Sequence, residues 1–304
     1  MNRIQLSSLA VITVLIVIAA SCIYRSSRDS ELASAPINSA NKNETLTKKF
    51  DEDKKSEKGD FVVEYLKIKN SRYDEIDRQL KEVKLLEKAA DKLNRSLILP
   101  YDIYLKTKDC GEANAYYDSD EHSVTVCYEL MEHFYKVFRS VGESDQKAYD
   151  KMFDAVRFAF LHEIGHALID TYNLPITGNE EDAADRCSTF INLTELGEDG
   201  VNAVLAAADA FAIESKGNAP DKRNLADEHL LQEQRFYNSL CLIYGSNTKK
   251  YAYILNDNYL PKERAARCPS EYERTVDSWS DLLRSCLKTH KGFIRRSIRR
   301  IIAI

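Results

Sequence analysis

The chain has 304 residues and a formal net charge of −5, with 44% hydrophobic and 30% charged side chains. This composition is ordinary for a soluble globular protein, and the length gives room for one large domain or two modest ones that share a cleft. The slightly acidic balance lacks the excess of basic residues that binds nucleic acids, so we expect no nucleic-acid partner.

The first 22 residues have the pattern of an export signal. Arg3 gives a short positive start, residues 9–20 form an almost unbroken apolar run, and Ala19-Ala20-Ser21 supplies the small residues that a signal peptidase requires. Cys22 follows directly and resembles the cysteine that is lipidated in bacterial lipoproteins. The alternative is an uncleaved N-terminal anchor, because the apolar run is close to the shorter limit for spanning a bilayer. In either case we expect a membrane-tethered protein of the cell envelope, facing the periplasm or the exterior.

The use of cysteine agrees with an oxidising compartment. Of the seven cysteines, an even number remains once Cys22 is set aside, as in a disulfide framework. The sequence does not give the connectivity. We expect Cys110 to pair with Cys127, since they bracket a predicted hairpin, and Cys241 to pair with Cys268. Buried free thiols are the alternative for any of them.

Composition divides the rest of the chain into a tether, a domain and a tail. Residues 23–59 have almost no large apolar side chains and cannot bury enough surface to offset the entropy of ordering, so we expect a flexible linker. Residues 60–286 form the predicted domain, and 287–304 form a basic amphipathic tail. Within the domain we expect an N-terminal sub-domain at 60–173 and a helical sub-domain at 174–286, and the hydrophobic period becomes helical from about residue 148.

The periodicity predicts an α+β fold with a small N-terminal sheet and a mainly helical C-terminal half. The predicted strands lie at 61–65, 101–105, 113–117 and 123–128. A helix is expected over about 73–94. From about residue 148 a long apolar helix runs to Asn173-Leu174-Pro175, and Asn179 is the expected N-cap of the next helix. Further helices are expected at 203–213 and 228–244.

The long apolar helix carries His162-Glu163-Ile164-Gly165-His166. Two histidines four positions apart lie one turn apart and about 40° around the helix, so both rings can reach one ion. Glu163 sits beside them, near enough to contact a metal-bound water without being a ligand. The flanking residues are apolar, and a titratable cluster in a buried helix is costly unless something satisfies it. A surface helix with two chance histidines fits this setting poorly, so we expect zinc.

A catalytic zinc needs a third protein ligand and one open position. Glu181 and Asp185 stand four residues apart at the start of the next helix. The pair resembles the Glu-x-x-x-Asp element of the gluzincins, the thermolysin-like peptidases, in which the Glu is the third ligand and the Asp fixes the orientation of a ligand His. The alternatives are that Glu180 is the ligand, or that these acids only complement the helix dipole.

The chain as a whole resembles a bacterial family named as zinc metallopeptidases with a domain of unknown function. The resemblance spans residues 60–284 and rests on several separate motifs. These are Leu99-Pro100, residues 110–117, Cys127-Tyr128-Glu129-Leu130, residues 162–170, residues 178–185, Asp227-Glu228-His229, residues 234–238, Tyr244-Gly245, Leu260-Pro261, Cys268 and Trp279. The family's name is itself an inference from the zinc motif, so the resemblance implies a zincin-like metallopeptidase fold more directly than a substrate.

Two further elements resemble parts of thermolysin-like enzymes. Asn114-Ala115, followed by two tyrosines, is similar to the edge strand that holds an extended peptide there; an ordinary strand is the alternative. His229 is placed like the histidine that stabilises the oxyanion. A structural histidine beside acidic neighbours is the alternative, and Tyr237 is a weaker candidate for the same role.

The predicted function is hydrolysis of peptide bonds in protein or peptide substrates of the cell envelope. Zinc held by His162, His166 and Glu181 would activate a water, and Glu163 would act as the general base. One alternative is a zinc-stabilised binding module or inactive homologue, in which Cys187 or His229 closes the fourth position. Another is a zinc amidase acting on cell-wall peptides. We expect a monomer.

The tail at 287–304 places four arginines among isoleucines. As a helix it would have a basic and an apolar face, which is typical of a segment at a membrane interface. The alternative is a helix that docks over a hydrophobic groove of the domain.

Overall fold

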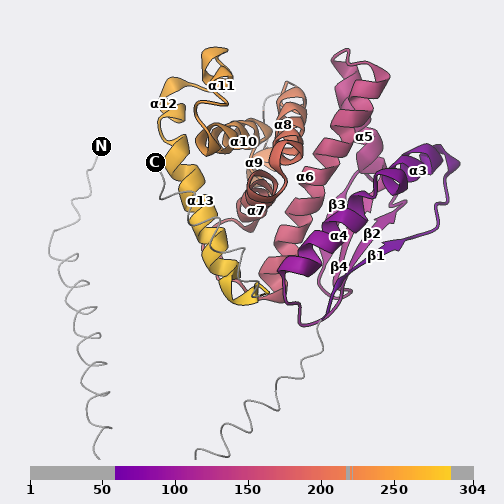
Figure 1. Cartoon of the computed structure of the whole chain (residues 1–304). Helices are drawn as coiled ribbons and strands as arrows, with labels where there is room; N and C mark the ends of the chain where they lie inside the picture. Colours follow the sequence, from indigo (N-terminus) through magenta and orange to yellow (C-terminus); the bar gives the residue numbers. More distant parts are fainter. Residues whose placement is uncertain (1–58, 217–219, 221, 289–304) are drawn as a thin grey trace, which may run out of the picture. The chain divides into compact units, whose positions relative to one another are not determined.

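The computed structural model describes residues 59–216, 220 and 222–288, which fall within one compact unit (Figure 1). The export segment with Cys22, the linker up to residue 58 and the tail after Lys288 lie outside the described residues, so the predictions for them stay predictions. In the part of the chain that is described, no helix has both the length and the apolar character needed to cross a bilayer.

A four-stranded sheet forms near the N-terminus of the described chain, as predicted. Its strands are β1 (Phe61–Tyr65), β2 (Ile103–Lys108), β3 (Ala115–Asp118) and β4 (Ser123–Cys127), in the spatial order β1-β2-β4-β3. β1, β2 and β4 are parallel, whereas β3 is antiparallel to β4 and forms one edge of the sheet. The prediction of a strand at 101–105 is displaced: Pro100 and Tyr101 lie in a bend, and the strand begins at Ile103.

The single helix predicted over 73–94 is wrong, because the segment forms two helices, α3 (Asp74–Val83) and α4 (Leu85–Ser96). Lys84 between them has a φ of 53°, and its N–H bonds to the carbonyls of Leu80 and Lys81, which ends α3. A continuous helix would turn Leu85 about 140° away from Leu80. The break therefore allows both helices to bury their apolar faces.

Helices form most of the remaining fold, and α6 (Asp145–Thr171) lies at their centre (Figure 1). The sheet and helices α3, α4 and α5 lie on one side of α6, and α7, α8, α10 and α13 lie on the other. The other elements are η1 (Ser71–Tyr73), α5 (Tyr128–Ser140), α7 (Glu180–Glu195), α8 (Gly197–Glu214), α9 (Lys222–Ala226), α10 (Gln232–Ser246), α11 (Tyr253–Asn256), α12 (Lys262–Ala265), α13 (Cys268–Leu283) and η2 (Arg284–Cys286).

These helices confirm the predicted α+β class, with differences in detail. The helix expected at 203–213 is part of the longer α8, and α10 begins at Gln232 because residues 227–231 form a loop. Helices α5 and α13 were not predicted. Two hydrophobic cores flank α6: one lies between α6, the sheet and α3–α5, and the other is built around α8 and α10. Phe158 of α6 contributes to the second core by meeting Phe211 edge-on.

α6 and α7 approach each other closely at Gly165. A Cβ atom added to Gly165 would lie 3.0 Å from the Cα of Ala184 and 3.1 Å from the Cβ of Cys187. Ser188 of α7 donates a hydrogen bond of 2.7 Å to the carbonyl of Phe158 in α6. Glycine inside a helix costs about 1 kcal/mol relative to alanine. The contact with α7 explains why the smallest residue is nevertheless suited to this position.

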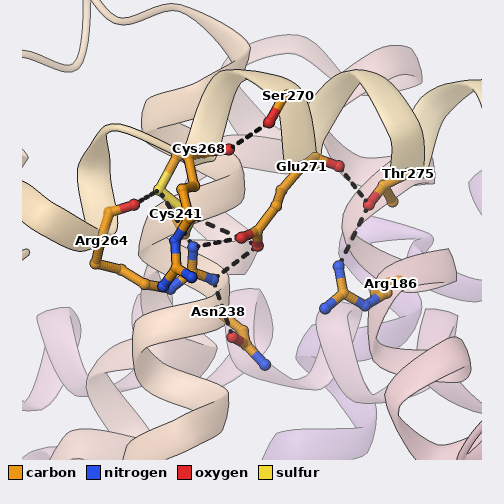
Figure 2. The surroundings of a disulfide bond; sticks show 9 residues. Arg186, Asn238, Cys241, Arg264, Cys268, Ser270, Glu271 and Thr275 are labelled. Atoms are coloured by element: carbon orange, nitrogen blue, oxygen red, sulfur yellow. Dashed lines mark hydrogen bonds and ion pairs between the residues drawn. A yellow bond between two sulfur atoms is a disulfide. The ribbon is translucent and has the colours of Figure 1, made fainter.

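Both predicted disulfides form. Cys110–Cys127 closes the hairpin of β3 and β4, and Cys241–Cys268 joins α10 to α13. Figure 2 shows the second bridge beside the ion pair of Arg264 and Glu271, whose two guanidinium-to-carboxylate distances are both 2.8 Å. Cys187 and Cys286 are buried free thiols, so for these two the alternative expectation, a buried thiol without a bridge, is confirmed.

We predict that Gly165→Leu lowers the free energy of unfolding by about 1–3 kcal/mol, because the larger side chain must push α7 away from α6. Thermal or urea unfolding followed by circular dichroism measures the change. Gly178→Leu is the matched control, since a Cβ atom at Gly178 meets nothing within 4 Å. Equal stability of the Gly165→Leu variant and the wild type would contradict the close contact.

Candidate functional site

The two histidines of α6 and one carboxylate of α7 face a common position. Nε2 of His162 lies 3.2 Å from Nε2 of His166 and 3.0 Å from Oε2 of Glu181. Nε2 of His166 lies 3.4 Å from Oε1 of Glu181. Asn179 begins α7 at this place, as predicted, by accepting a hydrogen bond from the N–H of Asp182. The structure therefore brings together the three residues that were predicted as ligands.

This donor set fits a zinc ion. A tetrahedral ion with bonds of about 2.0–2.1 Å separates two of its donor atoms by about 3.3 Å. The three distances given above, from 3.0 to 3.4 Å, bracket that value, with Oε2 of Glu181 facing His162 and Oε1 of Glu181 facing His166. Two imidazole nitrogens that face each other can share only one proton, so a cation between them would satisfy both lone pairs. Two histidines and one carboxylate are also a donor set known from catalytic zinc sites.

Each histidine is held by a carboxylate at its other ring nitrogen. Nδ1 of His162 donates to Oδ1 of Asp185 at 2.8 Å, as the sequence predicted, and Nδ1 of His166 donates to Oε1 of Glu180 at 2.8 Å. These bonds leave the lone pair of each Nε2 directed at the common position. Glu180, which was the alternative third ligand, instead binds the outer nitrogen of His166.

Asp185 in turn is held by Arg235 of α10. The guanidinium makes two hydrogen bonds of 2.8 Å to the two carboxylate oxygens, and the two side chains are only 13% and 16% exposed. The guanidinium also lies 4.1 Å from the ring centre of Phe211 in α8. Arg235 thus connects α10 and α8 to the carboxylate that orients His162.

The charges in the site are arranged to keep the carboxylates ionised. Burial alone would raise the pKa of Asp185, but the charge of Arg235 and the hydrogen bond from His162 hold it well below its usual range. Burial likewise opposes ionisation of Glu181, but hydrogen bonds from three imidazoles lower its pKa. Burial disfavours a charged His162, yet Asp185 and Glu181 outweigh this and raise its pKa to about 9. The site therefore favours a bound positive charge.

Glu163 lies beside this cluster but does not take part in it directly. Its Oε1 is 4.0 Å from Nε2 of His162, and the residue is 8% exposed. Burial raises the pKa of the Glu163 carboxyl, which the neighbouring imidazoles and the main-chain N–H of Tyr117 partly offset. A carboxylate with a raised pKa, next to a metal position and facing a cleft, is suited to accept a proton from water.

His229 reaches the site from the loop between α9 and α10. Its Nε2 lies 2.8 Å from Oε2 of Glu181, and its ring stacks on that of His162 with the ring centres 5.8 Å apart. Asp227 holds the loop by accepting the N–H of His229. Asn179 also donates its side-chain amide to the carbonyl of Glu228 at 2.6 Å, so the residue that caps α7 also holds this loop. His229 remains 46% exposed on its side chain.

A cleft of about 750 Å³ is lined by His162, Glu163, His166, Glu181 and His229, and β3 forms part of its wall. The N–H of Cys127 bonds to the carbonyl of Asn114, which fixes the ladder between β3 and β4. In an antiparallel ladder this pairing turns the main-chain groups of Ala115 and Tyr117 toward the free edge of the sheet. Asn114 and Ala115, the predicted substrate-binding residues, therefore lie in the cleft with an edge available for an extended peptide.

Three residues near the site were missed as contributors. Arg235 forms a buried ion pair with Asp185, which was not predicted because the two residues are 50 positions apart. Tyr117 donates its hydroxyl to Asp170 at 2.8 Å across the cleft wall. Of the three, only Asp170 could have been found from the sequence, because it follows His166 by four residues and therefore lies on the same side of α6. Cys187 packs against Gly165 and is not among the cleft residues.

The site thus consists of two histidines and the carboxylate of Glu181 around one position, with Glu163 beside them, in a mixed α+β domain. The chain belongs to the family described as "Putative metallopeptidase", whose model matches residues 65–283. This membership supports a peptidase-like function and implies a metal. No curated protein and no solved structure matches the chain.

We predict that Arg235→Gln weakens zinc binding by about 10–100-fold, because Asp185 then loses the partner that keeps it charged and oriented. Arg235→Lys should have an intermediate effect, since lysine keeps the charge but not the two parallel hydrogen bonds. Zinc affinity is measured by competition with a chelating dye. Arg274→Gln, which changes an exposed arginine of α13, is the control. Unchanged zinc affinity in both Arg235 variants would show that the orientation of His162 does not depend on Arg235.

Proposed function

We propose that the protein is a zinc-dependent peptidase of the cell envelope that hydrolyses peptide bonds with Glu163 as the general base. The observation that carries the proposal is the convergence of His162, His166 and Glu181 at tetrahedral spacing, with Glu163 alongside in an open cleft. The export pattern at the N-terminus and the two disulfides support a setting outside the cytoplasm. Cys22 is the proposed site of a lipid tether.

Zinc at this position supplies Lewis acidity, which polarises a substrate carbonyl and acidifies water. Asp185 and Glu180 hold the two imidazoles so that each Nε2 faces the metal position. Glu163 accepts the proton of the attacking water and passes it to the nitrogen of the leaving group. His229 donates a hydrogen bond to the oxyanion that develops on the carbonyl. The main chain of Ala115 pairs with an extended substrate along the free edge of β3.

We predict that Glu163→Gln lowers turnover by about 10²–10⁴-fold while zinc stays bound, because the amide cannot accept the proton. The measurement is zinc stoichiometry by atomic absorption together with hydrolysis of casein and of cell-wall material. Glu121→Gln, an exposed carboxylate paired with Lys106, is the control and should match the wild type. Full hydrolysis by Glu163→Gln would rule out the assigned base.

A second candidate function is a zinc-stabilised binding module. It is favoured by one observation: the ligand atoms of His162, Glu181 and His229 lie within 4.8 Å of one another, so His229 could close the fourth position. Such a site would hold zinc without turnover. The half-exposed side chain of His229 and its place on a loop favour the catalytic role instead.

His229→Asn separates the two candidates. For the peptidase we predict a loss of about 10²–10³-fold in kcat/KM with zinc affinity nearly unchanged, because one oxyanion donor is removed. For the binding module the wild type hydrolyses nothing, and His229→Asn weakens zinc binding instead. Calorimetric titration of zinc and steady-state hydrolysis, made on the same preparations, distinguish these outcomes.

A further inference from the structure

An apolar groove lies on the face of the α6–α7 pair that is opposite the metal position. Its volume is about 400 Å³. Most of its apolar lining comes from four helices, including Leu85 and Leu93 of α4, Phe160 and Leu168 of α6, Phe190 of α7 and Leu283 of α13. Leu168 follows Leu161 by seven residues, so both lie on one side of α6, away from His162 and His166. No residue with a role in the proposed peptidase chemistry lines this groove.

The described chain ends at one end of the groove. Leu287 lines it and forms a β-bridge with Leu97. Two hydrogen bonds of 2.8 Å, from Ile98 N–H to the Cys286 carbonyl and from Lys288 N–H to the Ser96 carbonyl, fix this contact. Residues 289–304 therefore continue from a point that adjoins the groove.

The sequence of residues 289–304 is suited to an apolar groove of this kind. At the helical period, Ile294, Ile298, Ile301 and Ile302 fall within an arc of about 100°. The four arginines at 295, 296, 299 and 300 fall within the adjoining arc of about 140°. A helix of this segment would be about 24 Å long, compared with about 18 Å for the twelve residues of α4 along the groove wall.

We propose that residues 289–304 dock in this groove of their own chain, with the isoleucines against the four helices and the arginines in solvent. The tether at Lys288 gives the segment an effective concentration that is typically millimolar for a short linker, which other occupants must exceed. The charged residues that line the groove are four basic ones, Lys88, Lys92, Arg157 and Arg284, and two acidic ones, Glu195 and Asp199, so charge does not favour a basic segment there. The apolar side chains and the tether, rather than charge, therefore determine which segment occupies the groove.

The test compares the full chain with a chain that ends at Lys288, using a labelled synthetic peptide of residues 289–304 as the probe. Fluorescence anisotropy should show saturable binding to the shortened chain. Binding to the full chain should be at least about tenfold weaker, because the tethered copy competes. Equal binding to both chains, or binding to neither, would overturn the proposal.

Two substitutions keep the test valid if the shortened chain does not fold. Ile298→Asp combined with Ile301→Asp, in the full chain, should open the groove to the peptide, whereas Arg296→Gln combined with Arg300→Gln should leave it closed. Ala89→Trp should fill the groove and abolish peptide binding to either chain. Hydrogen exchange of α4 and α13 gives an independent readout and should rise when the isoleucines are replaced.

Other occupants give different results. If the segment binds membranes instead, the full chain co-sediments with anionic vesicles through residues 289–304 and the groove accepts the peptide equally with or without them. If the segment docks in a second copy, the full chain is a dimer by analytical ultracentrifugation and the isoleucine variant is a monomer. Either result would overturn docking within one chain.

Discussion

The close approach of α6 and α7 at Gly165 is the constraint on which the rest of the site depends. Glu181 and Asp185 reach the two histidines because α7 lies against α6 where Gly165 has no side chain to keep the helices apart. The hydrogen bond from Ser188 to Phe158 continues the same contact one turn further along. A separation larger by one methyl group would move the carboxylates of Glu181 and Asp185 away from the histidines together. Glycine is unfavourable inside a helix, but at position 165 it allows the short distance between α6 and α7.

The carboxylates near the histidines need support from outside α6 and α7, because buried charges are costly unless they are paired. α10 provides it through Arg235, and α10 is itself joined to α13 by the Cys241–Cys268 bridge (Figure 2). Beside the bridge, Arg264 of α12 pairs with Glu271 of α13 and donates a hydrogen bond to Asn238 of α10. The helices of the C-terminal half therefore hold Arg235 in the position from which it binds Asp185. Asn179 has a comparable position, since it starts α7 and holds the loop that presents His229.

Local spacing carried the sequence predictions that the structure bears out. His162 and His166 share a face because they are four residues apart, and Glu181 and Asp185 follow the same rule on the next helix. The cap at Asn179 and the Cys110–Cys127 bridge also depended on short-range patterns. The break at Lys84 was not predicted, because the apolar repeat shifts by one residue at this point and only the packing of α3 and α4 shows the shift. Arg235 and Tyr117 were missed because their partners are distant in sequence, and no period relates them to the histidines.

Gly165 also bears on how such sites can be recognised in other sequences. The five-residue pattern of two histidines and a glutamate leaves two positions free and arises often by chance. In this chain the second free position, Gly165, touches the partner helix, which has small residues three positions apart at this contact, Ala184 and Cys187. A search that required a small residue on both helices, at this offset from the acidic pair, would test whether two helices can meet. Chance matches to the histidine pattern alone have no reason to satisfy that second condition.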